Sequence, residues 1–578
     1  MRRSGLVCLD SRTVVVRTVF AALVMAVGCG DDGGAETTTG STGETGDASS
    51  TGVVVTTGDS DDEGTTSSSG GETSEGTSEP TTGVTMFRVA GKLAYEFVPY
   101  DPEADGLDYG GIVQRPIRGA TVLLIDADSE EELGSVEADG EGNYSFEYEG
   151  SARVKLYVLA ETTAPPIVVE DNTEDDAIYV LASEEIDSGA DVKLDVVATS
   201  GWTGSAYGEL RAAAPFAVLD AAYTAGRRLL DEVTPAPVFP QLLLNWSVNN
   251  RPEFGDVTDG QIGTSLWDGS ELLILGKEDV DTDEFDSHVI VHEWCHYLQA
   301  RLGRSDSPGG DHSFGALIDP RVAWGEGSCN AMTGIMLDPD PVYTDSSGPK
   351  QAEGSATDFE FNNIDAAMNP GWYGELTVAG IVYDLYDGSN EPFDAVELGL
   401  QPVYDAMIGL RETPALTTVF AYVSAIQAAN PGAAADIDAL VEYQQFDADF
   451  GISAVVDEWG TDETHTAALP GSLPLYADGV LGEVLDVALV GGFASNRLEQ
   501  NRYIKIVGDG QLVAVESMCL ADIDLAVYHV GEQVATAFTE SGDEYLEFET
   551  VQGETYVLVV QGTNQNAGPY AATIAINP

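Results

Sequence analysis

Two histidines and a glutamate stand within five residues of one another at positions 292–296, in a chain that has six histidines in all. Segment 291–299 reads VHEWCHYLQ and contains the pattern H-E-x-x-H. On a helix, His292 and His296 lie on one face one turn apart, so both imidazoles can reach a single Zn²⁺. Glu293 lies beside that face, where its carboxylate can take a proton from metal-bound water. The pattern therefore predicts metal-assisted hydrolysis.

The residues around this motif predict the helix that it needs. Asp286 is a candidate N-cap, apolar residues fill the positions between, and Gly303 is a candidate C-terminal stop. The metzincin arrangement requires a glycine at position 299 and a histidine at position 302, but the sequence has Gln299 and Leu302. That class of metallopeptidase is excluded, so a third ligand must come from another segment.

A second segment, 323–330, reads AWGEGSCN and places Glu326 between two glycines, thirty residues after His296. It resembles the third-ligand segment of the glutamate zincins, and the two motifs together look most like the fungalysin and thermolysin members of that group. The resemblance implies that His292, His296 and Glu326 bind zinc and that Glu293 is the general base. In those families, an acid four residues after the ligand glutamate orients a ligand histidine. This chain has Asn330 at that position. An amide oxygen still accepts an imidazole N–H but makes the ligand less basic, so we expect a weaker or slower site.

Three other side chains near the motifs are candidates for the same site. His288 lies one turn before His292 and could compete as a ligand, although a residue there more often caps or lines the cleft. His312, in the loop between the motifs, could line the cleft or replace Glu326 as a ligand, but a solvated loop histidine is the simpler interpretation. Tyr373 precedes a predicted helix and is a candidate donor to a tetrahedral oxyanion.

A run of acids precedes the motif helix and raises the question of a second cation. It contains Glu278, Asp279, Asp281, Asp283 and Glu284. These carboxylates could bind Ca²⁺, but they lack a recognisable calcium-loop spacing. We expect the run to be solvated.

Two of the five cysteines lie beside the proposed ligands. Cys295 follows His292 by three residues, and Cys329 follows Glu326 by three. They could form a disulfide that joins the two helices, which export would allow; two small buried thiols are the alternative, since Cα separation cannot be read from sequence. Cys519 is left unpaired.

The N-terminus resembles a bacterial lipoprotein signal. Basic residues precede a short apolar stretch at 19–27, and segment 25–29 reads MAVGC, which is similar to a lipobox. The resemblance implies that residues 1–28 are removed and that Cys29 is acylated as a lipid anchor; an ordinary cleaved signal peptide is the alternative. We expect export to the bacterial cell envelope as a lipoprotein, or to the cell surface or extracellular space.

Composition separates a tether from the folded part of the chain. Residues 30–85 contain twelve acids and no Lys or Arg, among mostly Thr, Ser and Gly. Such a segment cannot bury enough surface to fold, so 29–85 is predicted to be a disordered acidic tether. The whole chain has 24 basic and 98 acidic residues, a formal net charge of −74, which excludes nucleic acid and anionic membrane as electrostatic partners.

The remaining elements divide into three predicted domains. Period-two strands such as 120–125 and 153–159 fill 86–203, which resembles a transthyretin-like or carboxypeptidase-regulatory-like β-sandwich. From about 209 the period becomes helical, strands follow at 242–246 and 271–275, and helices dominate from 287 to about 450, which predicts an α+β domain over 204–465. Strands return in 466–578, which resembles the pre-peptidase C-terminal β-sandwich.

The sequence thus predicts a multidomain protein, with an α+β zincin-like metallopeptidase domain flanked by two all-β sandwiches. The predicted activity is hydrolysis of peptide bonds in a protein or peptide substrate by metal-activated water. The alternative is a surface binding protein or adhesin, in which the sandwiches bind the partner and the zincin domain is an inactive scaffold.

Overall fold

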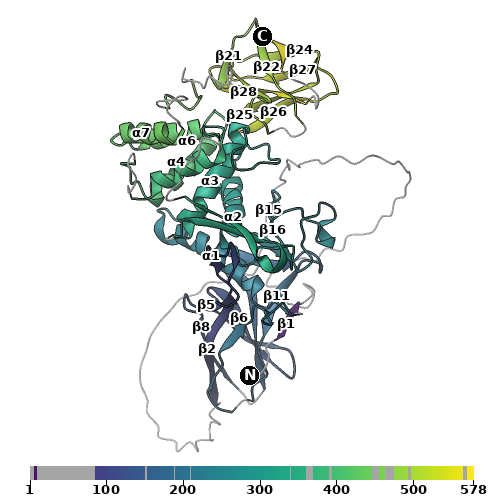
Figure 1. Ribbon diagram of the computed structural model, residues 1–578, viewed down its shortest axis with the longest axis vertical. Coiled ribbons are helices and arrows are strands. Elements are labelled where there is room, and N and C mark those ends of the chain that lie inside the picture. Colours follow the sequence, from purple (N-terminus) through teal and green to yellow (C-terminus); the bar gives the residue numbers. More distant parts are fainter. Residues whose placement is uncertain are drawn as a thin grey trace, which may run out of the picture.

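The computed structural model of the 578-residue chain describes residues 5–8, 85–149, 153–187, 189–208, 210–338, 340–359, 369–388, 394–445, 455–461, 474–492, 496–563 and 569–578. Cys29, most of the predicted signal peptide and nearly all of the predicted tether lie outside these residues. Within them, no helix has both the length and the apolar character needed to cross a membrane. Figure 1 shows the N-terminal strands, the helices and the C-terminal strands following one another along the long axis.

Two sheets form the N-terminal part. The smaller one is built around the long strand β2 (Met86–Phe97), which pairs with β5 (Val113–Pro116), β8 (Asn143–Glu149), β12 (Val192–Lys193) and β13 (Val196–Ala198). On β8, buried residues alternate with exposed ones, as the period-two pattern predicts. A short hairpin joins β3 (Tyr100–Asp101) and β4 (Gly106–Leu107).

The larger sheet continues across residue 203, the predicted domain boundary. Its N-terminal strands are β1 (Gly5–Cys8), β6 (Ala120–Asp126), β7 (Glu132–Glu137), β9 (Val154–Thr163), β10 (Pro166–Asp171) and β11 (Ala177–Ala182). Strand β10 then pairs in parallel with β14 (Leu242–Trp246), followed by β16 (Leu272–Ile274) and β15 (Leu266–Trp267) at the edge. The N-terminal and central parts therefore share one sheet, and one hydrophobic core spans both.

Seven α-helices lie in the described part of the chain, and they form the middle of the molecule (Figure 1). They are α1 (Ala214–Glu232), α2 (Ser287–Leu302), α3 (Pro320–Met336), α4 (Glu375–Tyr386), α5 (Leu400–Gly409), α6 (Val419–Ala429) and α7 (Ala434–Gln445). Helix α1 lies where the sequence period becomes helical, and its apolar side chains Phe216 and Leu219 are only 1% and 2% exposed. Helix α3 packs against both α2 and α4, and all of its residues are buried.

A four-stranded sheet interrupts the region in which helices were predicted to dominate. It consists of β17 (Gly276–Lys277), β18 (Asp281–Thr282), β19 (Val342–Ser347) and β20 (Glu353–Asp358). Polar residues make up most of β19, so hydrophobic periodicity gives little indication of this strand. The sheet brings the acid run at 278–284 next to β19, which lies some sixty residues later in the chain.

The C-terminal part is a two-sheet sandwich with its own hydrophobic core. One sheet has the order β21 (Tyr476–Gly479), β23 (Asn501–Val507), β28 (Thr555–Gly562), β25 (Ile523–His529) and β26 (Glu532–Ala537). The other has the order β22 (Glu483–Leu489), β29 (Tyr570–Asn577), β24 (Leu512–Met518) and β27 (Tyr545–Glu549). The segment in which strands were predicted to return is thus built of strands.

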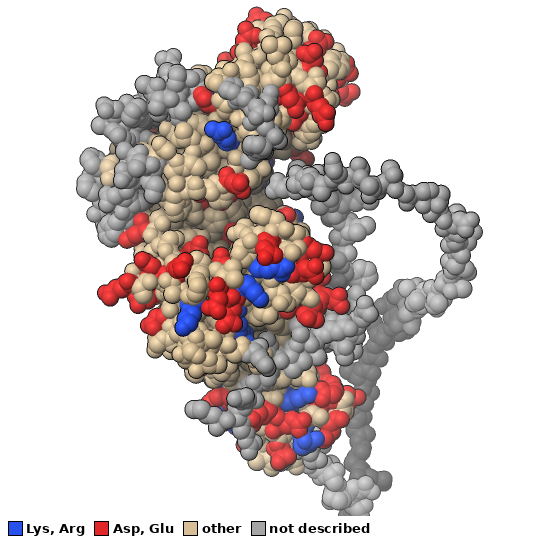
Figure 2. Space-filling view, turned by 45° about the vertical axis from the view of Figure 1, so that its right-hand side comes forward, with Lys and Arg blue, Asp and Glu red and all other residues tan. Residues whose placement is uncertain are grey.

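The surface reflects the strong excess of acids. On the face drawn in Figure 2, Asp and Glu side chains are spread over each part of the molecule, and Lys and Arg side chains are few. A surface of this kind repels polyanions.

Candidate metal centre

Helix α2 carries the H-E-x-x-H motif, and its ends agree with the predicted bounds. It begins after Asp286 and ends at Gly303, whose N–H donates to the carbonyl of Leu298. The Asp286 side chain, however, makes no capping hydrogen bond. Its Oδ2 instead accepts from the hydroxyl of Ser346 at 2.6 Å, which ties the start of α2 to β19.

Helix α3 presents Glu326 toward α2. Asp319 caps the helix by accepting from the N–H of Arg321 at 2.9 Å, and Pro320 occupies its first turn. A Cβ on Gly327 would lie 2.4 Å from the carbonyl oxygen of Glu375, so a glycine is required where α3 meets α4. The small residue after the glutamate therefore permits the close helix contact that positions it.

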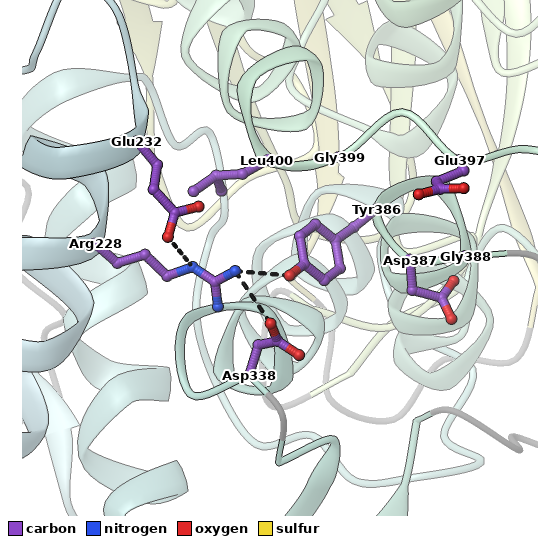
Figure 3. Close-up of a pocket in the computed structure, with 9 residues that line it drawn as sticks. All are labelled: Arg228, Glu232, Asp338, Tyr386, Asp387, Gly388, Glu397, Gly399 and Leu400. Carbon is purple, nitrogen blue, oxygen red and sulfur yellow. Dashed lines mark hydrogen bonds and ion pairs between the residues drawn. The ribbon is translucent and has the colours of Figure 1, made fainter.

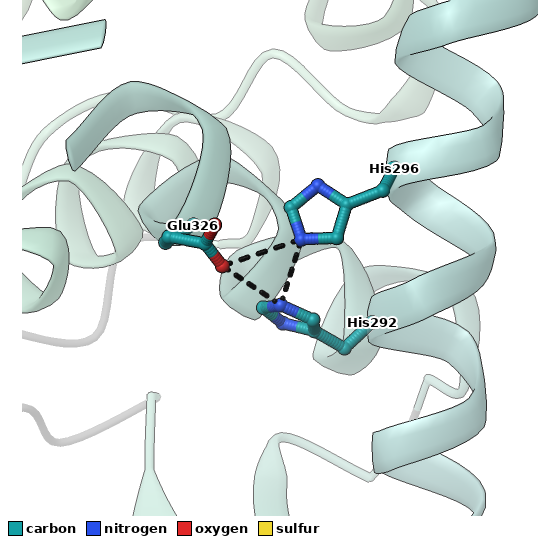
Figure 4. A group of neighbouring side chains, drawn as sticks. All are labelled: His292, His296 and Glu326. Carbon is teal, nitrogen blue, oxygen red and sulfur yellow. Dashed lines mark hydrogen bonds and ion pairs between the residues drawn. The ribbon is translucent and has the colours of Figure 1, made fainter. Parts of the chain in front are cut away.

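Three ligand atoms converge between the two helices (Figure 4). The Nε2 atoms of His292 and His296 lie 3.0 Å apart, and each lies close to Oε2 of Glu326, at 3.1 and 3.2 Å. Four-coordinate zinc with bonds of about 2.0–2.1 Å places neighbouring ligand atoms about 3.3 Å apart. The three atoms thus have nearly the spacing of ligands around one ion, and this group could hold a metal.

A disulfide lies directly behind one of these histidines. Cys295 and Cys329, the pair considered in the sequence analysis, are bonded and link α2 to α3 with their Cα atoms 5.3 Å apart. The Cys329 sulfur lies 3.6 Å from Nδ1 of His296, on the side of the ring away from the other ligand atoms. A proton on Nδ1 leaves the Nε2 lone pair facing the centre.

The other candidate ligand, His292, does not have Asn330 as a hydrogen-bond partner. Nδ1 of His292 is buried and has no hydrogen-bond partner among the described residues, so Asn330 does not orient this ring. Ligand histidines usually donate their second N–H to an acceptor. His292 therefore lacks one support of a strong metal ligand.

Glu293 lies beside the ligands and is partly buried. Its Oε2 accepts from the backbone N–H of Trp267, at the edge of the large sheet, at 2.8 Å. Burial raises the pKa of Glu293 to about 7; the charge of Glu326 adds to the rise, and His292, His312 and the Trp267 N–H oppose it. A carboxyl group with such a pKa can both accept and release a proton near neutral pH.

His312 lies at this centre, not in a freely solvated loop, and its side chain is 33% exposed. Its Nε2 is 3.4 Å from Oε2 of Glu326, and its Nδ1 is 3.2 Å from Oε2 of Glu375. Burial lowers the pKa of His312, but the Glu375 hydrogen bond and the charges of Glu326 and Glu293 outweigh it and raise the pKa to about 9. Glu375, in the first turn of an apolar helix, is the partner that the sequence analysis missed.

The other candidate residues have different surroundings. Nε2 of His288 lies 3.1 Å from the carbonyl oxygen of Asp340, and burial lowers the pKa of the ring. The hydroxyl of Tyr373 donates to the Pro370 carbonyl at 3.3 Å, within its own loop. Neither residue belongs to the group of converging ligand atoms.

A separate surface pocket of about 350 Å³ lies between α1, α4 and α5 (Figure 3). Arg228 lines this pocket, and its guanidinium already contacts Glu232, Asp338 and the Tyr386 hydroxyl. None of the metal-centre residues lines this pocket.

Comparison with known proteins gives partial likenesses only. No family model matches the chain, and no curated protein matches it. The chain is similar to a solved structure of the pre-peptidase C-terminal domain of collagenase from Bacillus anthracis, at 11% identity and a TM-score of 0.15, over 18% of this chain and 94% of that one. It is also similar to PliG from Salmonella Typhimurium, a periplasmic inhibitor of g-type lysozyme, at 15% identity and a TM-score of 0.13, over 18% of this chain and 97% of that one. The resemblance of the central region to zincins rests on its two motifs.

Proposed function

We propose that this protein is an exported zinc-dependent endopeptidase of the glutamate-zincin type. The observation that supports this most is the convergence of His292, His296 and Glu326 to within 3.0–3.2 Å of one another. Two imidazole nitrogens and one carboxylate oxygen form a common ligand set of catalytic zinc. When bound, zinc would polarise the substrate carbonyl and make a bound water acidic.

Glu293 is the general base of the proposed reaction. Its carboxylate removes a proton from the attacking water and passes it to the leaving amine. The hydrogen bond from Trp267 fixes one carboxylate oxygen and leaves the other available for the proton. The raised pKa suits a group that must hold a proton between the two steps.

His312 is the proposed donor to the oxygen of the scissile carbonyl, in place of Tyr373. Glu375 holds Nδ1 of the ring, while Nε2 lies toward Glu326. With a pKa of about 9, this imidazole is protonated at neutral pH and can stabilise developing negative charge.

A peptide substrate is favoured by the position of strand β15. It is the last strand of the large sheet in the described residues, and the Trp267 N–H faces Glu293. An extended peptide can add to such an edge by main-chain hydrogen bonds, which would bring its carbonyl groups past the proposed base.

Zinc content and hydrolysis of a denatured protein test this proposal together. The purified chain is expected to contain about one zinc per molecule and to cleave reduced, denatured casein at sites that mass spectrometry can map. Glu326→Ala removes a ligand, so metal content and activity should fall together; Glu232→Ala, at an exposed residue of α1, is the matched control. A surface binding protein with an inactive zincin scaffold would show no hydrolysis by the wild type, which would refute the proposal.

Anchoring through Cys29 forms part of the proposed function. A lipid on this residue, followed by a long acidic tether, would hold the enzyme at the cell envelope and away from the bilayer. Wild-type protein should then partition into detergent, and Cys29→Ser should release it into the soluble fraction. A wild-type protein that is fully soluble after export would refute the anchor but leave the peptidase proposal intact.

A further inference from the structure

A second group of carboxylates lies on the four-stranded sheet. Asp281 on β18, Asp283 just after it and Asp345 on β19 each offer an oxygen within 4.8 Å of the others. Asp286, at the start of α2, lies close enough for its charge to act on all three. The acid run is thus not simply solvated, because β19 adds an acid from a distant part of the chain.

Two of these acids are buried with oxygens that accept no hydrogen bond. Asp283 is 2% exposed and Asp286 is fully buried, and Oδ1 of each has no partner. Their Oδ2 atoms are bound by the hydroxyls of Ser265 and Ser346. A buried carboxylate oxygen without a partner is costly unless a cation or a proton neutralises it.

No basic side chain neutralises the group. In the described part of the chain, no Lys or Arg forms an ion pair with any of the four acids. Lys277 is the cross-strand neighbour of Asp281 but is exposed and forms no ion pair with it. The nearby Arg211 is bound to Glu284 in a buried ion pair. Burial and mutual repulsion raise the pKa of Asp281 to about 6, and the same two causes raise the pKa of Asp283 well above its ordinary value.

We propose that Asp281, Asp283 and Asp345 bind a calcium-class divalent cation that holds β18 and β19 against the start of α2. Carboxylate oxygens are the ligands that hard cations prefer, and an irregular set of side chains from two strands and a loop suits the flexible coordination of Ca²⁺ better than the strict octahedron of Mg²⁺. Oδ1 of Asp286 is available as a further oxygen.

This cation would also support the wall of the metal centre, a consequence that rests on the proposed function. Tyr343 and Asp345 are two residues apart on β19, so their side chains lie on the same face. The Tyr343 ring centroid is 6.4 Å from that of His292 and 5.9 Å from that of His288. Fixing Asp345 therefore fixes the strand that packs against a proposed zinc ligand.

Equilibrium dialysis of the zinc-loaded chain against CaCl₂ tests the site, with bound calcium and zinc measured by atomic emission. Asp283→Asn and Asp345→Asn should each bind about one calcium fewer than wild type, whereas Asp279→Asn, an exposed member of the same acid run, should bind as much as wild type. CaCl₂ should raise the melting temperature of wild type more than MgCl₂ does, and should not raise that of Asp283→Asn.

Two results would overturn the site. One is equal calcium binding by wild type and Asp283→Asn. The other is a wild type that CaCl₂ does not stabilise at neutral pH, which would mean that shared protons neutralise the acids. Failure of the proposed function is measured separately, since Glu326→Ala should lose zinc and hydrolysis while it still binds calcium.

Discussion

Tyr503 of the C-terminal sandwich donates a 2.5 Å hydrogen bond to the carboxylate of Asp319, the N-cap of the helix that carries Glu326. Asn501 donates to the same oxygen at 2.7 Å, and Arg321 forms an ion pair with this carboxylate. Asp319 is 1% exposed, so these contacts form inside the interface between the sandwich and the helices. Glu326 lies seven residues further along the helix, about two turns. The sandwich therefore helps to position a candidate metal ligand.

Removing this hydrogen bond should weaken both the fold and the metal centre. Tyr503→Phe leaves the ring in place but leaves a buried carboxylate short of one donor, which costs roughly 1–3 kcal/mol. We expect a lower free energy of unfolding and faster loss of zinc to a chelator. Tyr545→Phe, at an exposed position of the same sandwich, is the control and should change neither. Equal zinc retention by both variants would show that the sandwich does not support the centre.

The disulfide between α2 and α3 should stabilise the protein by closing a loop. Its cysteines are 34 residues apart, for which the chain-entropy model gives about 3–4 kcal/mol. Replacing both with alanine should lower the denaturant midpoint and increase zinc loss, since His296 also loses its sulfur contact. Cys519→Ala controls for removal of a thiol. An unchanged midpoint in the double variant would contradict a stabilising role.

The elements with strong patterns could be predicted from sequence. Strand 242–246 and the bounds of the H-E-x-x-H helix agree with the structure because apolar periodicity and Gly303 specify them. The two candidate histidine ligands could be named because H-E-x-x-H places them on one face of a helix. Glu326 was named through the resemblance of its segment to a zincin third-ligand segment, and the close helix contact that Gly327 allows was seen only in the structure.

The missed features depend on contacts between distant segments. Strand β19 is mostly polar, and Asp345 becomes recognisable as a cation ligand only when the sheet places it beside Asp281. Likewise, His312 lies in an irregular loop, and only tertiary packing brings it between Glu326 and Glu375. Short-range patterns contain no information about such pairings.

His312 should act on the chemical step without holding the metal. His312→Gln preserves a neutral N–H donor but removes the positive charge, so we expect kcat to fall about 10–100-fold with zinc content unchanged. The control is His529→Gln, in the C-terminal sandwich, which should keep full activity. Loss of zinc from His312→Gln would identify the residue as a ligand instead of a donor.

Glu170, on β10, should make the protein less stable as the pH rises. Burial and the charges of Asp176 and Glu271 raise its pKa to about 7. The folded state therefore binds more protons than the unfolded state between about pH 4.5 and 7, and stability falls across this window. After allowance for partial exposure, Glu170→Gln should be about 1 kcal/mol more stable than wild type at pH 8 and similar to it at pH 4.

Urea unfolding of both proteins at pH 4, 6 and 8 measures this difference. Glu147→Gln, at an exposed position on β8, is the control and should change stability by less than about 0.5 kcal/mol at each pH. If the Glu170→Gln difference stayed constant with pH, the carboxyl group would not be the source of the effect.

The Glu293→Gln variant separates metal binding from proton transfer at the candidate centre. The amide has nearly the same size and can still accept the Trp267 hydrogen bond through its oxygen, so the fold and zinc content should be unchanged. A neutral amide cannot take the proton of the attacking water. General acid–base assistance contributes about 10²–10⁴-fold, and because Glu293 would serve both proton transfers, the loss in kcat should reach the upper end of that range.

Zinc content decides how a loss of activity in Glu293→Gln is interpreted. If the variant keeps about one zinc per chain and no longer cleaves casein, the missing function is proton transfer, because the ligands His292, His296 and Glu326 are untouched. In Glu326→Ala, by contrast, activity should disappear in proportion to the zinc that is lost. A zinc-loaded Glu293→Gln protein that cleaves casein at the wild-type rate would show that Glu293 is not the general base and that this group of residues is not the catalytic site.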